Sequence, residues 1–123
     1  MQLARIRGRS GAPVAAAYLE GTLVELPAGE DPSFADLATL LAAGPGALDR
    51  AEAVARRALE RGEGLDPERV EFLAPTTPSV FLGLGYNYRA LAAHEGVPLG
   101  THPEVFAKLP GCAIGHDAPI RVP

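Results

Sequence analysis

The first quarter of the chain alternates short apolar runs with turn residues, the pattern of antiparallel strands. Apolar-rich segments lie at residues 3–6, 14–19 and 22–26, and the polar, glycine-containing stretch 7–11 separates the first two. Glu20-Gly21 separates the second and third at the length of a two-residue hairpin loop. We therefore predict that the chain begins with three antiparallel strands.

In the next segment, from Asp31 to Gly44, the apolar residues recur at helical spacing. Asp31 is a good N-cap with Pro32 at the first helical position, and Gly44-Pro45 is a stop signal. The apolar positions predicted to share one face are Phe34, Leu37, Leu40 and Leu41. A second helix is predicted over 47–61 and ended by Gly62, with Leu48, Ala51, Ala55, Ala58 and Leu59 inward.

The remainder divides at a proline-containing segment. Residues 66–75 read as a short strand, residues 74–79 contain two prolines among small polar residues, and residues 79–85 form a nearly all-apolar run. Such a run is typical of a strand buried on both faces. We predict a small α+β domain over 1–74, a linker over 75–78 and the beginning of a second domain over 79–123.

Composition and charge narrow the class of protein. The chain is 47% hydrophobic and 21% charged with only 6% aromatic residues, so we expect a globular protein with a core of small aliphatic side chains. A net charge of −4 without a basic run argues against nucleic-acid binding. The single cysteine, the charged N-terminus and the lack of a long apolar stretch predict a cytoplasmic protein without membrane contact.

Chemistry-bearing residues gather directly after the apolar run, in Gly85-Tyr86-Asn87-Tyr88-Arg89. Polar and aromatic groups at the end of a strand often line a small-molecule site. A short helix over 90–95, closed by Gly96, is predicted to follow. The pair Gly83-x-Gly85 is a weak dinucleotide signal, because Tyr88 occupies the place of the third glycine.

This segment is similar to the Gly-x-Asn-Tyr-x-x-His-x-x-Glu-x-Gly signature of the fumarylacetoacetate hydrolase family. Downstream, Pro103-Glu104-Val105-Phe106-Ala107-Lys108 resembles the Pro-x-x-Phe-x-Lys block of that family, and residues 110–123 keep the order of its next segment. The predicted hairpin, paired helices and residues 73–75 match the small leading domain of such proteins. The resemblance covers nearly the whole chain.

The resemblance implies a fold and an activity. It implies that residues 79–123 supply the first strands of a mixed β-sandwich or roll, the catalytic domain. Family members are hydrolases, isomerases or decarboxylases that act on small 2-oxo or 1,3-dioxo acids with Mg²⁺ or Mn²⁺. On this basis we expect a 2-oxo acid substrate and a homodimer.

Two departures from the family pattern concern the catalytic base. Leu91 stands where the family has its histidine, and His94 stands where it has its glutamate, with Glu95 next to it. Leucine cannot accept a proton, whereas His94 can act as a relocated general base with Glu95 as its partner. The alternative is that His94 is only a polar residue on a helix.

Other candidate site residues follow from the same two blocks. The resemblance places Lys108, the only lysine, near the substrate carboxylate or a developing enolate. We expect Tyr88 and Arg89 to bind substrate, Arg89 through its guanidinium fork. A solvated surface lysine and a salt bridge within the fold are the alternatives for Lys108 and Arg89. His102 and His116 show no metal-ligand spacing with His94, and Cys112 is expected to serve packing.

The family metal is held by a Glu-x-Glu pair and a later aspartate, and no Glu-x-Glu occurs in this chain. We therefore expect no metal ligands here and the leading portion of such an enzyme, inactive alone. Two functions remain open. One is a module of a metal-dependent enzyme, and the other is a non-catalytic or regulatory relative.

Overall fold

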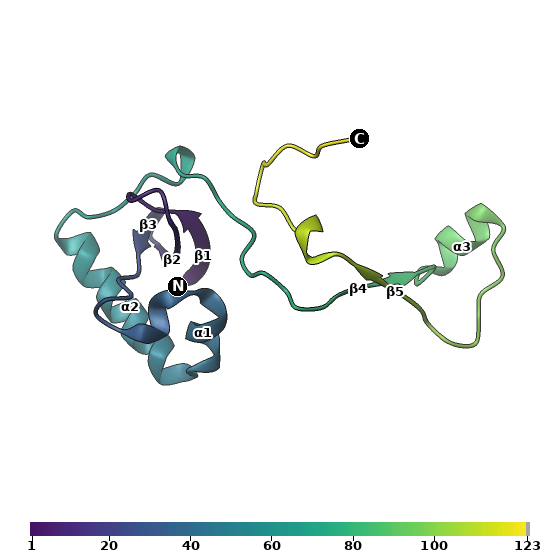
Figure 1. Ribbon diagram of the computed structural model, residues 1–123, viewed down its shortest axis with the longest axis horizontal. Helices are drawn as coiled ribbons and strands as arrows, with labels where there is room; N and C mark the ends of the chain where they lie inside the picture. The colour runs from purple at the N-terminus through teal and green to yellow at the C-terminus, as the bar shows by residue number, and fades with distance from the viewer. Residues whose placement is uncertain (123) are drawn as a thin grey trace. The chain divides into compact units, whose positions relative to one another are not determined.

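The computed structural model describes residues 1–122, which combine α-helices with two small antiparallel sheets, an α+β content (Figure 1). The chain divides into two compact units. The first comprises Met1–Thr76 together with residues 114–122, and the second comprises Thr77–Ala113. The division falls within the proline-containing segment 74–79. Residues 114–122 group with the first unit, although the sequence analysis assigned them to the second domain.

The first unit is built on the predicted three-stranded sheet. The strands are β1 (Gln2–Arg7), β2 (Pro13–Leu19) and β3 (Thr22–Glu25), and they are antiparallel in the order β1-β2-β3. The two-residue connection between β2 and β3 has φ of 51° at Glu20 and 81° at Gly21. Positive φ at both central residues is the geometry that matches the twist of a tight hairpin. The predicted strands are therefore confirmed to within one or two residues.

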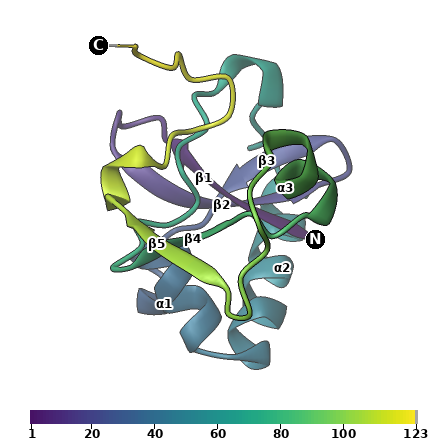
Figure 2. The ribbon, with the colours of Figure 1, turned by 90° about the vertical axis from the view of Figure 1, so that its right-hand side faces the viewer.

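Helices α1 (Leu37–Ala42) and α2 (Pro45–Glu60) cover one face of this sheet (Figures 1 and 2). The core between them consists mostly of small side chains, as composition predicted. Its fully buried members are Ala15, Ala17, Leu19, Val24, Leu26, Phe34, Leu37, Leu40, Ala47, Ala51, Ala55 and Ala58. Buried apolar area is the main favourable term in folding, so this layer carries much of the stability of the unit.

The predicted first helix is split in two. Pro32–Ala35 forms a 3-10 turn, Asp36 is extended, and α1 then begins at Leu37. Asp36 Oδ1 accepts a hydrogen bond from the Thr39 backbone N–H at 2.8 Å, so this carboxylate caps a new helix instead of continuing the old one. Because the break rotates the apolar face, Leu40 is buried while Leu41 is 55% exposed, and the prediction of Leu41 as inward is wrong.

Asp31 caps the preceding turn as predicted. Its Oδ1 accepts from the backbone N–H of Ser33 at 2.9 Å and from the Ser33 hydroxyl at 2.7 Å, and Arg50 Nε donates to Oδ2 at 2.8 Å. The Ser33 hydroxyl bond and the Arg50 pair lower the pKa of Asp31 to about 2. This carboxylate therefore ties the entry of the helical layer to α2.

Helix α2 begins earlier than predicted. Pro45 was expected to end the first helix, but it occupies the first turn of α2 after Gly44, whose φ is 81°. Proline suits the first helical position because it lacks the N–H that has no partner there. Ala51, Ala55 and Ala58 are buried as predicted, and the outward residues Glu52 and Arg56 form an ion pair with an Oε1–Nη2 distance of 2.6 Å.

The other face of the sheet is covered by residues that were predicted as a strand, and that prediction is wrong over most of 66–75. Asp66 caps a 3-10 turn at Pro67–Arg69, because its carboxylate accepts from the Glu68 N–H at 3.0 Å. Only the end of the segment pairs with β1, through a single bridge from Phe72 to Ile6. Phe72 packs there with Val70 and Leu65 against Ile6, Ala16 and Leu23.

The second unit consists of a β-hairpin with an inserted helix. Strand β4 (Phe81–Gly85) pairs antiparallel with β5 (Glu104–Lys108), and α3 (Arg89–Glu95) follows the end of β4 (Figure 1). Gly96, with φ of 67°, ends α3 as predicted. The strand prediction is confirmed, but the prediction that it is buried on both faces is wrong. Val80, Leu82 and Leu84 are 66%, 59% and 55% exposed, because the sheet has only two strands.

Among residues 1–122, no helix has both the length and the apolar character needed to cross a bilayer.

The split of the first helical segment yields a matched test. We expect Leu40→Ala to lower the free energy of unfolding by about 2–5 kcal/mol, because it leaves a cavity in the layer between α1 and the sheet. Leu41→Ala, one residue away, should change it by less than about 0.5 kcal/mol. Urea denaturation followed by circular dichroism measures both. Equal losses for the two variants would contradict the observed helix face.

Candidate functional site

The candidate site is an open pocket of about 540 Å³ where β4 ends, within the second unit. It lies between the turn that leaves β4 and the loop that leads into β5. Polar groups come from both sides of it. Tyr86 and Asn87 come from the turn and Arg89 from the start of α3, while Thr101 and His102 come from the loop and Glu104 from the start of β5. A volume of this size accommodates a small organic acid.

The packing of the hairpin explains why β4 has glycine at positions 83 and 85. A methyl group at Gly83 would come within 2.5 Å of the Phe106 ring, which lies across the strand pair from it. A methyl group at Gly85 would come within 3.1 Å of Glu104 Cδ. Glycine therefore lets the side chains of Phe106 and Glu104 lie flat over β4. The Gly83-x-Gly85 pair is accounted for by this packing without any nucleotide.

Tyr86 turns the chain out of β4 in an uncommon conformation. Its φ is 44°, in the left-handed region that bulky residues rarely adopt. Such a conformation costs on the order of 1–3 kcal/mol and is frequent at functional sites. The turn brings the half-buried Tyr86 ring into the pocket wall beside Asn87.

The phenol of Tyr86 faces carboxylates from two elements. The negative charge of Glu95, in the last turn of α3, is the largest cause of a raised pKa at Tyr86. Partial desolvation, a hydrogen bond to the Glu95 carboxylate and the charge of Glu104 raise it further. The hydroxyl of Tyr86 therefore keeps its proton through neutral and mildly alkaline pH, and it remains a hydrogen-bond donor.

The structure brings together some of the predicted site residues and separates others. Arg89, the first residue of α3, lines the pocket with Tyr86 and Asn87. Tyr88 is the N-cap residue of α3 and is 73% exposed, outside the pocket lining. His94 and Glu95 are exposed in the last turn of α3. Of the predicted residues, only Arg89 belongs to the pocket wall. Glu95 lies outside it, but its charge raises the pKa of the pocket residue Tyr86.

Lys108 lies at the opposite end of the hairpin. It is paired with Phe81, whereas Gly85 at the pocket is paired with Glu104. Four residues of strand correspond to about 13 Å along the sheet. The Lys108 ammonium lies over two aromatic rings instead, 5.8 Å from the Phe81 centroid and 5.6 Å from the Phe106 centroid. Within this unit Lys108 makes cation–π contacts and does not reach the pocket.

Sequence reasoning singled out the segment 85–89 but gave Tyr86 no role of its own, and it missed Glu104 and His102 as pocket residues. His102 Nδ1 and Thr101 Oγ1 are in hydrogen-bond contact at 2.8 Å, which orients the ring at the pocket edge. The sequence offered one signal for Glu104. When the two blocks are aligned as a hairpin, Glu104 pairs with Gly85 at the end of β4. The positive φ of Tyr86 has no counterpart in the sequence pattern.

Residues 1–122 contain no group of three or more His, Cys, Asp or Glu side chains arranged to hold a metal ion. The pocket carboxylate Glu104 and the nearby Glu95 are on different elements and make no such cluster. The described residues therefore do not fit the divalent metal that the family resemblance implies.

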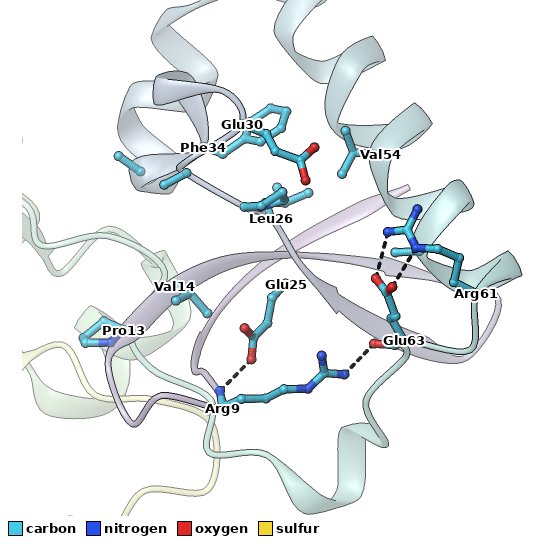
Figure 3. A pocket seen from close by; sticks show the side chains of 14 residues that line it. Arg9, Pro13, Val14, Glu25, Leu26, Glu30, Phe34, Val54, Arg61 and Glu63 are labelled. Atoms are coloured by element: carbon cyan, nitrogen blue, oxygen red, sulfur yellow. Dashed lines mark hydrogen bonds and ion pairs between the residues drawn. The ribbon is translucent and has the colours of Figure 1, made fainter.

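A second pocket, of about 380 Å³, lies in the first unit and has charged walls (Figure 3). Four of its charged residues, Arg9, Glu25, Arg61 and Glu63, bond to one another. The Arg9 backbone N–H donates to Glu25 Oε1 at 2.6 Å, its guanidinium donates to the Glu63 carbonyl at 2.6 Å, and Arg61 pairs with the Glu63 carboxylate at 2.6 Å. These bonds join β3 to the segment that follows α2. The pocket is thus a structural junction, and the candidate site remains the one at the end of β4.

Comparisons with protein-family models, with curated proteins and with solved structures gave no match to this chain.

The electrostatics of Tyr86 can be tested directly. We expect Glu95→Gln to lower the pKa of Tyr86 toward its ordinary value of 10, because it removes the largest charge that opposes ionisation. Glu104→Gln should lower it less. Absorbance titration of tyrosinate in a Tyr18→Phe, Tyr88→Phe background isolates the signal of Tyr86. Glu68→Gln in the first unit serves as the control, and a Tyr86 titration unmoved by Glu95→Gln would contradict the arrangement.

Proposed function

We propose that this chain is the leading part of a fumarylacetoacetate hydrolase-like enzyme that acts on small 2-oxo or 1,3-dioxo acids. The observation that carries the proposal is the pairing of the two resembling sequence blocks. The Gly-x-Asn-Tyr block leaves the end of β4, and the Pro-x-x-Phe-x-Lys block forms β5, its antiparallel partner. Two segments that resemble one family in the sequence thus meet at a single pocket.

The exposed face of the hairpin supports the fold expected for such an enzyme. Leu82, Leu84, Val105 and Ala107 alternate onto one face, and all are exposed. In a β-sandwich or roll, an aliphatic face of this kind packs on a second sheet about 10 Å away. We infer that β4 and β5 are strands of such a layered sheet.

The pocket residues have chemistry suited to an anionic substrate. The Arg89 guanidinium is a bidentate partner for a carboxylate. The protonated Tyr86 hydroxyl donates a hydrogen bond to an oxygen that becomes negative when a C–C bond next to a carbonyl is cleaved. Asn87 adds an amide that both donates and accepts. Together they bind and orient a small 2-oxo acid.

His94 and Glu95 remain the proposed base and its partner, from the last turn of α3. Successive helical residues point about 100° apart, so Glu95 does not orient His94 directly. Lys108 lies at the other end of the hairpin, so it is not assigned to a small substrate bound in this pocket. Because no carboxylate cluster is present in residues 1–122, the role we propose for this chain is substrate binding and proton transfer.

One observation favours the alternative of a non-catalytic relative. The family histidine position is taken by Leu91, which is 43% exposed on α3 and cannot accept a proton. A protein of this kind would keep the pocket and bind the acid without turning it over. Binding experiments therefore test the pocket in both cases, and only rate measurements separate the two functions.

For binding, we expect Arg89→Gln to raise the Kd for acetylpyruvate at least about tenfold, because a charge-assisted hydrogen bond to the carboxylate is lost. Backbone NMR shifts during titration of the chain measure this and locate the site. The matched control is Arg69→Gln, in the first unit, which should leave the Kd unchanged. Shifts confined to the first unit, or equal affinities for both variants, would refute the pocket as the binding site.

For catalysis, the test uses acylpyruvate hydrolysis by a form of the protein that is active with Mg²⁺ or Mn²⁺. We expect His94→Ala to lower kcat about 100-fold with little change in KM if His94 is the base. His116→Ala, in the first unit, is the matched histidine control. Full activity of the His94→Ala variant would show that the reaction proceeds without this histidine and that the relocated-base hypothesis is wrong.

A further inference from the structure

His102 lines the pocket at the end of β4, whereas His94 lies outside its lining. It belongs to the loop that leads into β5, and Arg89 and Asn87 line the pocket from the other side. A group that transfers a proton to or from a ligand must come within hydrogen-bond reach of it. Among the histidines of residues 1–122, His102 is the one placed to do so for a ligand held in this pocket.

The loop restricts the backbone of His102 from both sides. Pro103 follows it, and a residue before proline is confined largely to extended conformations. Gly100 precedes it by two residues, and a methyl group there would come within 3.3 Å of the His102 carbonyl oxygen. Glu104 is already the first residue of β5 and is paired with Gly85. The loop therefore holds His102 close to the end of β4.

The hydroxyl of Thr101 orients the imidazole ring, through the contact of 2.8 Å between Thr101 Oγ1 and His102 Nδ1. A hydroxyl group both donates and accepts hydrogen bonds. Thr101 accepts when Nδ1 carries a proton and donates when Nδ1 does not, so the contact persists in both protonation states of the ring. A carboxylate or carbonyl partner would hold only a protonated Nδ1. The ring can therefore gain and lose a proton at Nε2 without losing its orientation.

The two proton-bearing side chains of the pocket suit different tasks. The raised pKa of Tyr86 makes its phenol a weak acid, so it stabilises a negative oxygen by hydrogen bonding and keeps its proton. Histidine is the side chain best suited to exchange protons near neutral pH. A proton that must leave the protein and reach a ligand atom is therefore better supplied by His102 than by Tyr86.

We propose that His102 is a catalytic residue of this pocket, the acid that protonates the carbon atom released when a 1,3-dioxo acid is cleaved. The inference rests on the proposed function, since it concerns a further step of the same reaction at the same site. Arg89 holds the carboxylate from one side of the pocket, and His102 reaches the carbon chain of the acid from the other. This task differs from that of His94, which is proposed to activate water.

Hydrolysis of such an acid requires two proton transfers. Water adds to the acyl carbon while a base takes one of its protons, and the C–C bond to the methylene carbon then breaks. The electron pair of that bond moves onto the methylene carbon and its neighbouring carbonyl, which gives the enolate of a 2-oxo acid. His102 transfers the proton on Nε2 to the methylene carbon. The proton taken from water restores His102, so the reaction consumes only water.

The test is hydrogen–deuterium exchange at C3 of pyruvate, followed by proton NMR in D₂O with the form of the protein that is active with Mg²⁺ or Mn²⁺. By microscopic reversibility, the residue that protonates this carbon also removes a proton from it. We expect His102→Gln to slow both this exchange and acetylpyruvate hydrolysis at least about 100-fold, with the Kd for acetylpyruvate changed less than about threefold. His94→Ala should slow hydrolysis and spare the exchange, because water is not a reactant in it. His116→Gln, in the first unit, is the control and should slow neither.

Two further measurements examine the ring itself. Thr101→Val should slow the exchange about tenfold, because the hydroxyl that orients Nδ1 is lost, and Thr101→Ser should retain it. On the 123-residue chain, with no turnover needed, saturating acetylpyruvate should shift the Nε2 resonance of His102 in ¹H–¹⁵N spectra. The resonance of His116 should stay in place.

Undiminished exchange with His102→Gln would overturn the role of His102, and so would a His102 resonance that saturating acetylpyruvate does not move. If Arg89→Gln still weakens binding in that case, the pocket stands as the binding site and only the assignment of His102 fails. If acetylpyruvate shifts no resonance of the second unit, the proposed function fails together with this inference. Circular dichroism confirms that each variant is folded.

Discussion

The close approach of α2 to the sheet is the constraint on which the first unit depends. Ala47, Ala51, Ala55 and Ala58 form one buried face of α2, and they meet Ala15 and Ala17 of β2. Small side chains on both surfaces allow the helix backbone to lie near the sheet, and Phe34 and Leu40 fill the space at the side. Because interiors are packed to the density of organic crystals, enlarging any of these alanines would displace the helix as a whole. The capping carboxylates Asp31 and Asp36 then fix where the helical layer begins.

Local signals in the sequence predicted much of this unit. Glu20-Gly21 fixed the β2–β3 turn because two residues with positive φ suffice for a hairpin, and the alanine spacing of α2 showed its buried face. Two of the errors have a common cause. Asp36 and Asp66 bind nearby backbone N–H groups, so each carboxylate starts a new turn where the apolar pattern alone predicted a continuous helix or strand. Whether an aspartate caps a new turn or leaves the helix or strand to continue depends on the local backbone geometry. The pattern of hydrophobic residues alone does not reveal this.

The candidate site was only partly predictable, for a different reason. Order along the chain indicated that polar residues follow β4, and it identified Arg89. It did not show that Glu104 would come beside Tyr86, because that depends on the register in which β5 pairs with β4. The same register moves Lys108 away from the pocket and onto the rings of Phe81 and Phe106. A residue at a motif position can therefore take its expected role only if the strands pair in the right register. Long-range contacts determine that register.

Glu104 joins the two sequence blocks of the hairpin at the pocket. Its side chain lies over Gly85, and its charge raises the pKa of Tyr86. Glu95, on α3, supplies the larger share of the field. Because the two carboxylates come from different elements, the protonation of the Tyr86 phenol depends both on the register of β5 with β4 and on the placement of α3. The hydrogen-bonding state of the pocket is therefore determined by the hairpin and its inserted helix together.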